Sequence, residues 1–152
     1  MTSDRKLFME ATRAFEVRVA DKPELREAAF RLRYQVYCIE RGYEPGHGGI
    51  ESDRFDDRAG HAVLVQRSTG RVVGTVRVVA PSAAGDAGDL PMQQLCPTQV
   101  AQALRAGRTG EVSRFAISKE LRDPSCAGGV PLRLGLIRGA VQISAGLELT
   151  HW

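Results

Sequence analysis

Glu51-Ser52-Asp53-Arg54-Phe55-Asp56-Asp57 places four carboxylates and one arginine within seven residues. The stretch separates a long helical pattern from a series of strand patterns. Two more charged clusters flank it along the chain, Arg31–Tyr37 before it and Glu111–Phe115 after it. An acidic loop alone is typical of solvated surface. Three charged clusters set into apolar segments indicate a site assembled from distant parts of one domain.

Before this stretch, the pattern predicts a short helix over 1–13 and a strand over 15–20, where apolar and charged residues alternate. Asp21, Pro23 and Glu24 then form a helix start, because Asp can cap free N–H groups, Pro suits the first turn and Glu favours the positive end of the dipole. Apolar residues keep helical spacing from there as far as Gly42.

After the helix, glycines and a proline predict a loop over 42–60, with the acidic stretch at its far end. A β-hairpin should follow, because two apolar runs are joined by Ser68-Thr69-Gly70-Arg71. The further predicted elements are strands His61–Arg67 and Val72–Ala80, a loop Pro81–Leu90, a helix Pro91–Ala106 broken at Pro97, a strand Gly110–Ser118, a loop Cys126–Gly129, a helix Val130–Ala145 and a strand Leu147–Trp152.

This order predicts an α/β sandwich with a mixed, largely antiparallel sheet and a parallel crossover at its end. With 152 residues, the chain is expected to form one domain, 1–152. A domain that stopped inside the apolar strand 147–152 would leave backbone groups unpaired. We therefore expect the natural protein to continue beyond Trp152 with further strands.

Composition excludes several classes of function. The net charge of +3, without a long basic run, does not favour nucleic-acid binding. Cys38, Cys96 and Cys126 are widely spaced, which favours reduced thiols over zinc ligands or disulfides. No apolar run approaches the roughly 20 residues of a membrane-spanning helix. No signal peptide is evident at the N-terminus. A cytoplasmic location is the expectation.

The charged residues carry a resemblance. Arg33-x-x-x-Tyr37, then Tyr43, Glu51-x-Asp53-x-x-Asp56, Gly74-Thr75-Val76-Arg77 and Glu111-x-Ser113-Arg114-Phe115 follow one another in an order that resembles the signature of acyl-homoserine-lactone (autoinducer) synthases. Those enzymes are a branch of the GNAT-like acyltransferases. The match spans roughly residues 25–118. The resemblance implies a GNAT-like (acyl-CoA N-acyltransferase) α/β/α sandwich and an N-acyltransferase activity.

Departures from that signature point to relatives. Autoinducer synthases generally have Phe where this chain has Tyr37 and Trp where it has Tyr43. The segment 111–119, taken with 134–138, is more similar to N-acyl amino acid synthases and to acyltransferases associated with PEP-CTERM/exosortase systems. This sub-branch transfers a fatty acyl group to the amine of an amino acid or similar small molecule. The alternatives are a lactone-forming synthase that uses S-adenosylmethionine and a non-catalytic GNAT-like binding module.

Acyl transfer from a thioester to an amine needs a proton acceptor, stabilisation of the oxyanion and positioning of two substrates. The chain has no Gly-x-Ser-x-Gly elbow, which favours direct attack of the amine over an acyl-enzyme. Glu51 is the first candidate base, directly or through an ordered water, and Glu111 is the second. The sequence predicts that Gln at either position lowers turnover without unfolding the domain.

The other candidate site residues bind substrate or hold the site together. Asp53 and Asp56 either bind the substrate ammonium or pair with Arg33, Arg77 or Arg114. Neighbouring carboxylates would raise their pKa, facing arginines would lower it, and the sequence leaves the balance open. Arg77 and Arg114 interrupt apolar strands, so each faces solvent or is buried and paired. The substrate-binding candidates are Arg33, Tyr37, Tyr43, Asp53, Asp56, Arg77, Ser113 and Arg114.

For the acyl donor, the resemblance implies a phosphopantetheine thioester, carried by acyl-carrier protein or by coenzyme A, and no permanently bound cofactor. Gly128-Gly129-Val130-Pro131 precedes the last predicted helix, but the Arg/Gln-x-x-Gly-x-Gly/Ala spacing of coenzyme A sites is missing. This favours acyl-carrier protein. Carrier proteins are acidic, and the candidate docking charges are Arg105, Arg108, Lys119, Arg122 and Arg133.

Overall fold

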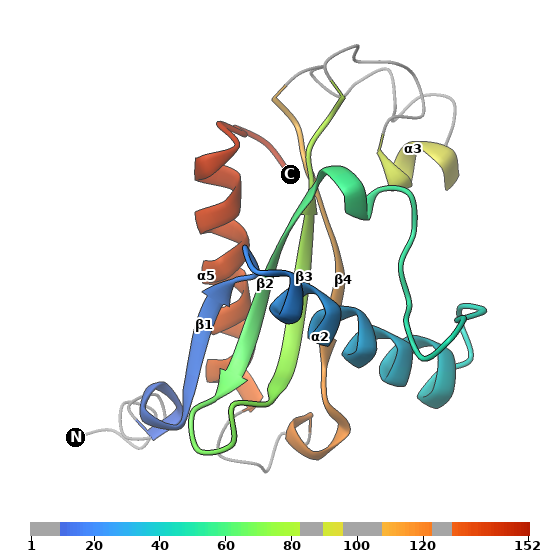
Figure 1. Ribbon diagram of the computed structural model, residues 1–152. Coiled ribbons are helices and arrows are strands. Elements are labelled where there is room, and N and C mark those ends of the chain that lie inside the picture. Colours follow the sequence, from blue (N-terminus) through green and yellow to red (C-terminus); the bar gives the residue numbers. More distant parts are fainter. Residues whose placement is uncertain (1–9, 83–89, 96–107, 123–128) are drawn as a thin grey trace.

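The computed structural model describes residues 10–82, 90–95, 108–122 and 129–152. A central sheet lies between two long helices, α2 on one face and α5 on the other (Figure 1). The strands are β1 Phe15–Val19, β2 Ala59–Gln66, β3 Val72–Val79 and β4 Glu111–Ile117; the helices are α2 Pro23–Arg33, α3 Pro91–Leu95 and α5 Gly129–Gly146. The predicted α/β/α sandwich is confirmed.

The four strands lie in the order β1-β2-β3-β4, and every neighbouring pair is antiparallel. Chain reversal at Gly70, whose φ is +70°, forms the predicted β2–β3 hairpin. The β2–β3 register places His61 opposite Arg77. The β3–β4 register places Arg77 opposite Ser113. Polar residues from three strands therefore lie side by side in the middle of the sheet.

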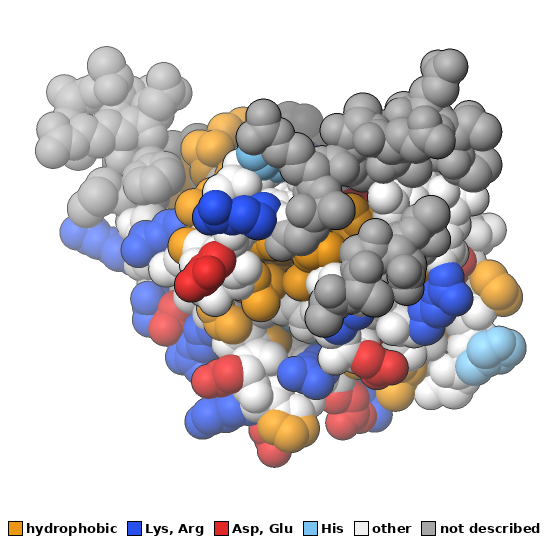
Figure 2. All heavy atoms as spheres, turned by 90° about the horizontal axis from the view of Figure 1, so that it is seen from above, with side chains coloured by type: hydrophobic (Ala, Val, Ile, Leu, Met, Phe, Trp, Pro, Cys, Tyr) orange, Lys and Arg blue, Asp and Glu red, His pale blue; other side chains and the backbone are white. Residues whose placement is uncertain are grey.

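Each face of the sheet has its own apolar core. Leu132, Leu136, Ala140 and Ile143 repeat along α5 and pack against Ala62, Leu64 and the alternate valines of β3. On the other face, Ala29 of α2 packs with Val63 and Val65, while Leu32 packs with Ala116. Seen from above, hydrophobic side chains gather near the middle of the molecule with charged side chains around them (Figure 2).

The helix that we predict as far as Gly42 changes its hydrogen-bonding pattern after Arg33. Residues Tyr34–Glu40 form a π-helix, so the α-helix proper ends at the arginine that the sequence assigns to the site. Such widened turns are rare and are frequently found at functional sites. The start also differs from the prediction, because the N-cap residue is Lys22 and no side chain caps the helix.

Strand β4 is irregular where it crosses the site. Its pairing with β3 shifts between Thr75 and Arg77, and Arg114 has a φ of +52°. An extra residue in one strand forms a bulge that re-aims side chains. A left-handed conformation in a residue other than glycine costs about 1–3 kcal/mol and is concentrated at functional sites. The bulge directs the Arg114 side chain toward the acidic loop.

The predicted strand Leu147–Trp152 is wrong as a full strand. Only His151 forms an isolated parallel bridge, with Thr109, and Glu148 adopts a φ of +53° that interrupts extended backbone. The parallel direction agrees with the predicted crossover, although the sheet itself is wholly antiparallel. Predicted elements over 1–9, 83–89, 96–107 and 123–128, including the break at Pro97, lie outside the described residues.

Candidate active site

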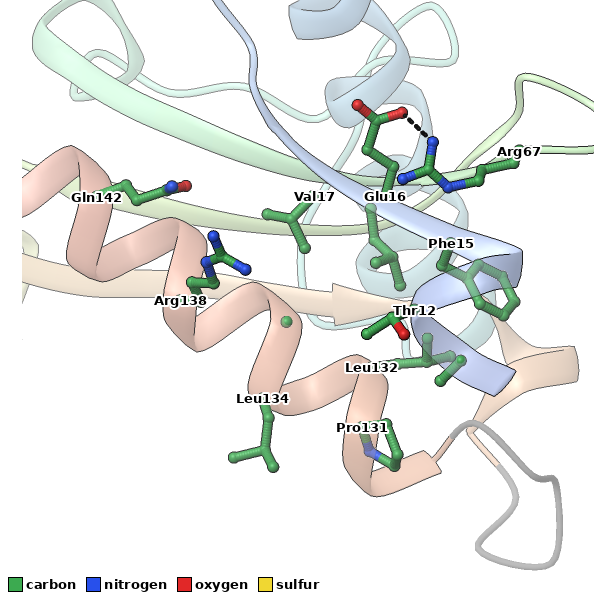
Figure 3. Close-up of a pocket in the computed structure, with 13 residues that line it drawn as sticks. Thr12, Phe15, Glu16, Val17, Arg67, Pro131, Leu132, Leu134, Arg138 and Gln142 are labelled. Atoms are coloured by element: carbon green, nitrogen blue, oxygen red, sulfur yellow. Dashed lines mark hydrogen bonds and ion pairs between the residues drawn. The ribbon is translucent and has the colours of Figure 1, made fainter. Parts of the chain in front are cut away.

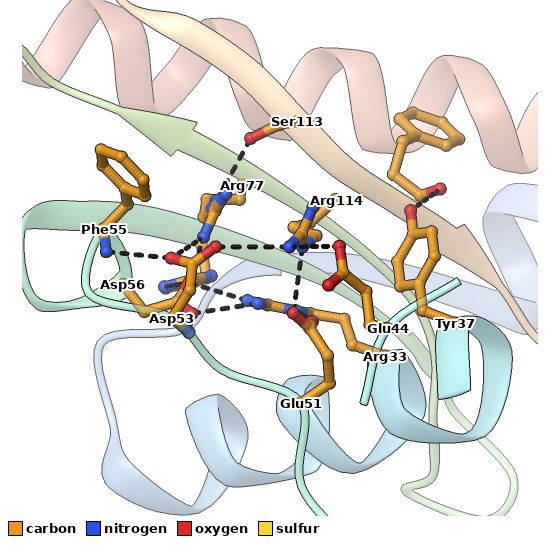
Figure 4. A network of polar contacts seen from close by, with 12 residues as sticks. Arg33, Tyr37, Glu44, Glu51, Asp53, Phe55, Asp56, Arg77, Ser113 and Arg114 are labelled. Atoms are coloured by element: carbon orange, nitrogen blue, oxygen red, sulfur yellow. Dashed lines mark hydrogen bonds and ion pairs between the residues drawn. The ribbon is translucent and has the colours of Figure 1, made fainter. Parts of the chain in front are cut away.

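Arg33, at the end of α2, is the centre of a buried network of ion pairs (Figure 4). Its Nη1 and Nη2 atoms donate to the two carboxylate oxygens of Asp56 at 2.7 and 2.9 Å. Its Nε donates to Glu51 Oε2. Neither acidic side chain is more than 5% exposed. All three nitrogens of this fully buried guanidinium therefore donate to carboxylates of the acidic stretch. Two of them form a two-point pair with Asp56.

Arg77 brings β3 into the same network. Its Nη1 donates to Asp53 Oδ1 at 2.7 Å and to Asp56 Oδ1 at 3.0 Å, and its Nε donates to Ser113 Oγ at 3.2 Å. The Arg77 side chain is fully buried. An arginine inside an apolar strand is therefore buried and paired, which is one of the two alternatives that the sequence leaves open.

Arg114 closes the network from β4 and is its most accessible cation, with 22% of its side chain exposed. Its Nε donates to Glu51 Oε1 at 3.1 Å, while its Nη2 contacts Glu44 Oε1 at 3.1 Å and Asp53 Oδ2 at 3.3 Å. Both oxygens of Glu51 thus accept from arginines. This geometry suits a carboxylate that fixes two arginines better than one that accepts a substrate proton.

Local turns hold the acidic loop in this position. The Asp53 N–H donates to Asp56 Oδ2 at 2.8 Å, and the Phe55 N–H donates to Asp53 Oδ1 at 2.9 Å. Phe55 packs with Val79 and Leu90. The two aspartates therefore shape the loop as well as pairing with arginines. Asp57 is exposed and takes no part in these contacts.

The pKa of Asp56 shows which electrostatic effect prevails. Burial alone would raise it, but hydrogen bonds from Arg33, the positive charges of Arg33 and Arg77 and the Asp53 N–H outweigh burial and lower it to about 2. Burial opposes the charge of Arg33 as well, yet its bonds to Asp56 and Glu51 raise its pKa. The facing arginines therefore keep the buried part of the network ionised.

Glu111 occupies a different environment at the start of β4. Its Oε2 accepts from the Met92 N–H at 2.6 Å, and the side chain is half-buried. Burial raises the pKa of Glu111; the Met92 N–H and the charges of Arg77 and Arg114 only partly oppose this. Of the two predicted bases, Glu111 has the environment that improves a proton acceptor at neutral pH.

Of the two tyrosines assigned to the site from the sequence, the structure places only one beside the network. The Tyr37 hydroxyl donates to the Phe115 carbonyl at 2.9 Å, next to the bulge, and the Arg114 guanidinium lies 5.7 Å from the centre of its ring. Burial raises the pKa of Tyr37. Tyr43 is 68% exposed and is not among the residues of the network. The structure brings Tyr37 to the site and leaves Tyr43 outside it.

Sequence reasoning missed two residues of this region. Glu44 lies in the glycine-rich loop and pairs with Arg114. His61 is 1% exposed, with Nε2 3.6 Å from Asp56 Oδ1 and its ring edge-on to Phe30. Burial lowers the pKa of His61 to about 4, so the ring is neutral at pH 7. The sequence did hold a signal for His61: it lies in an apolar strand of the predicted hairpin, and the other strand of that hairpin carries Arg77.

Three buried side chains on this face keep polar atoms without a hydrogen-bond partner in the described part of the chain. They are both ring nitrogens of His61, Thr75 Oγ1 and Arg77 Nη2. Unpaired buried polar groups are rare, and their concentration beside the network marks a polar interior within an apolar sheet. Over the same residues, no group of three or more His, Cys, Asp or Glu side chains could hold a metal ion.

A pocket of about 340 Å³ opens beside the accessible end of the network. Its walls are the carboxylates Glu44, Glu51 and Asp53, the cation Arg114, and Pro45, His47, Ile50 and Ser52. A second, larger groove of about 850 Å³ runs along α2 to the ends of the hairpin and β4. Carboxylates facing one partly exposed arginine can bind an ammonium group and a neighbouring anionic group together.

Comparison with known protein families assigns this fold to the acyltransferases. The profile of the acetyltransferase (GNAT) domain family matches residues 32–129, more than half of the chain. The chain therefore belongs to the GNAT family and is an N-acyltransferase domain. No curated protein matches the chain. Among the residues described, no helix is long and apolar enough to cross a membrane.

Solved structures share the fold at low sequence identity. The acyl-homoserine-lactone synthase LasI is 19% identical, with a TM-score of 0.62 over 89% of this chain and 68% of LasI. FeeM, an N-acyl amino acid synthase from uncultured soil microbes, is 17% identical, with a TM-score of 0.62 over 89% and 67%. A putative N-acetyltransferase from Lactobacillus plantarum is 18% identical, with a TM-score of 0.54 over 90% and 71%.

Proposed function

We propose that this GNAT domain transfers a fatty acyl group from a phosphopantetheine thioester to the amine of an amino acid or a similar small molecule. The observation that carries the proposal is the pocket beside Arg114, where three carboxylates and one partly exposed arginine lie together. Such a site complements a molecule with both an ammonium and a carboxylate group. An N-acyl amino acid is the product that this chemistry predicts.

In the proposed complex, Asp53 and Glu44 bind the ammonium group, because they are the more exposed carboxylates of the pocket, at 27% and 39%. Arg114 binds the carboxylate of the acceptor. Arg33 and Asp56 are buried behind the pocket, and Glu51, which lines it, has both oxygens paired with arginines. They position Arg114 and the acidic loop, since a network that is already paired does not reorganise when substrate binds.

Glu111 is the proposed base. Its place on β4, two residues before Ser113, and its raised pKa, to which the charge of Asp53 contributes, favour proton transfer from an amine bound at Asp53. The amine nitrogen attacks the thioester carbonyl, the amide bond forms and the carbon–sulfur bond breaks. The bound ammonium group loses two protons in all. Glu111 takes the first, which makes the nucleophilic amine, and releases it to solvent; the second, lost after attack, passes through Glu111 to the leaving thiolate.

Acyl-carrier protein is the donor that we propose, with acyl-CoA as the other candidate. The sequence lacks the usual spacing for coenzyme A pyrophosphate, and exposed Arg108 and Lys119 could meet an acidic carrier. Arg122 is paired with Glu40 and is less free to dock, and Arg105 lies outside the described residues. A cytoplasmic location and an association with PEP-CTERM/exosortase systems remain predictions from the sequence.

Acyl-carrier-protein thioesters and acyl-CoA, each incubated with a panel of amino acids and S-adenosylmethionine, test this proposal by mass spectrometry. We expect an N-acyl amino acid from the carrier-protein donor, with equimolar free thiol. Methylthioadenosine together with an acyl lactone would instead assign the chain to the lactone-forming branch. Ligand binding without any acylated product would favour the non-catalytic module.

A further inference from the structure

A third cavity lies on the opposite face of the sheet from the ion-pair network, between β1 and α5 (Figure 3). It has a volume of about 270 Å³. Nothing in the proposed acyl transfer uses it. Its apolar walls come from three parts of the chain, namely the 10–14 helical segment with β1, strand β2, and the first turns of α5. They include Phe15, Val17, Leu64, Pro131, Leu132 and Leu134.

Glycine at position 135 keeps this cavity open. A Cβ atom built there would lie 3.1 Å from Val17 Cγ2, closer than most real contacts. The small residue thus leaves a gap between α5 and β1 where an aliphatic side chain would otherwise fill the layer. An apolar gap of this size that reaches the surface can accept a short aliphatic chain.

One end of the cavity carries positive charge. Arg138 points from α5 toward β1, across the opening (Figure 3). Among the residues that the structure describes, no carboxylate pairs with Arg138. The other charged residues are Arg67 and Glu16, which pair with each other at 3.1 Å, while Glu16 also accepts from Arg18 at 2.8 Å. Within the described residues, Arg138 is therefore the cation of the opening that has no paired carboxylate.

We propose that this cavity binds a single-chain amphiphilic anion, with its aliphatic tail between β1 and α5 and its carboxylate on Arg138. The apolar walls and the Arg138 guanidinium select for both parts of such a molecule. Fatty acids and N-acyl amino acids share this chemistry. The inference does not depend on the proposed function, because the cavity lies across the sheet from the network and uses none of its residues.

Titration calorimetry with octanoate, N-octanoylglycine, octanol and octyltrimethylammonium tests the proposal, all below their micelle concentrations. We expect the two anions to bind and the cation not to bind. Octanol should bind about tenfold more weakly than octanoate, because it lacks the charge-assisted contact. Shortening the chain should weaken binding by about fourfold per methylene. Equal affinity for octanol and octanoate would overturn the role of Arg138.

Variants and amide chemical shifts locate the site. Arg138→Ala should weaken octanoate binding about tenfold, and Arg138→Lys should restore part of it. Arg26→Ala, which removes an exposed arginine from α2, is the matched control and should leave affinity unchanged.

Octanoate should shift amides of β1 and α5. Shifts confined to residues around Arg114, or wild-type affinity in Arg138→Ala, would contradict the proposal. Stronger binding of N-octanoylglycine than octanoate would identify an acylated amino acid as the better ligand.

Discussion

Arg33 and Asp56 form a buried two-point ion pair that joins the end of α2 to the acidic loop, with N–O distances of 2.7 and 2.9 Å. Arg77 shares Asp56 Oδ1 at 3.0 Å. One carboxylate therefore joins a helix, a loop and a strand. The pair holds the walls of the pocket, and we expect its loss to affect the fold before it affects the chemistry.

Asp56→Asn should lower the free energy of unfolding by about 3 kcal/mol or more, because it leaves two buried guanidinium groups without their shared charge. Urea unfolding followed by circular dichroism measures this. Asp57→Asn is the matched control, since Asp57 is the exposed neighbour. It should change stability by less than about 0.5 kcal/mol. Similar losses in both variants would contradict the assignment.

His61 should make stability depend on pH in a window above that of the carboxylates. Its pKa falls from 6.5 in the unfolded chain to about 4 in the folded one, chiefly through burial. The neutral ring thus contributes stability that is present above pH 6.5 and is lost as the pH falls toward 4. The loss should be about 3 kcal/mol relative to His61→Leu, which lacks the titration. Parallel stability curves for the two proteins would exclude this effect.

Tyr37→Phe should lower stability by about 1 kcal/mol, because the Phe115 carbonyl loses its hydroxyl donor beside the bulge. Arg114 lies over the same ring, so we also expect a higher KM for the amine. Tyr43→Phe removes a hydroxyl from an exposed ring and should change neither quantity. The prediction fails if thermal unfolding and KM are the same in both variants.

Glu51→Gln should destabilise the domain, whereas the sequence alone predicts that it does not. Both oxygens of this buried carboxylate accept from arginines, and the amide removes the charge that they share. A loss of about 3 kcal/mol in urea unfolding is expected. Turnover should fall because Arg114 is no longer held. Wild-type stability with reduced turnover would restore Glu51 as the candidate base.

The order of helices and strands could be predicted because the apolar residues keep clear periods. The hairpin, α2 and α5 follow from spacing that tertiary contacts do not override. The π-helix after Arg33 could not be predicted, since its backbone bonds depend on packing against β4. The strand predicted at the end of the chain is too long, because its backbone conformation also depends on tertiary contacts. Leu147 and Leu149 alternate with a polar residue and satisfy the strand pattern, but Glu148 adopts a left-handed conformation there.

The order of the charged clusters predicted that Arg33, Asp53, Asp56, Arg77 and Arg114 belong to one site, with their pairing as one of two alternatives. Which carboxylate stays free for chemistry did not follow, because that depends on burial and on the number of arginines that each oxygen contacts. Glu51 has two such contacts, whereas Glu111 has a backbone N–H. Equal residue types therefore acquire different roles from their three-dimensional environment.

Amide formation by Glu111→Gln is the most direct measurement of the central claim. The wild-type protein, an acyl-carrier-protein thioester and an amino acid should give an N-acyl product, with kcat/KM falling at low pH as Glu111 is protonated. The raised pKa of Glu111 shifts this fall to a higher pH than an unperturbed glutamate would give. The variant should be about 100-fold slower or more, without that acid limb and with an unchanged melting temperature. Wild-type rates and an unchanged pH profile in Glu111→Gln would contradict the account.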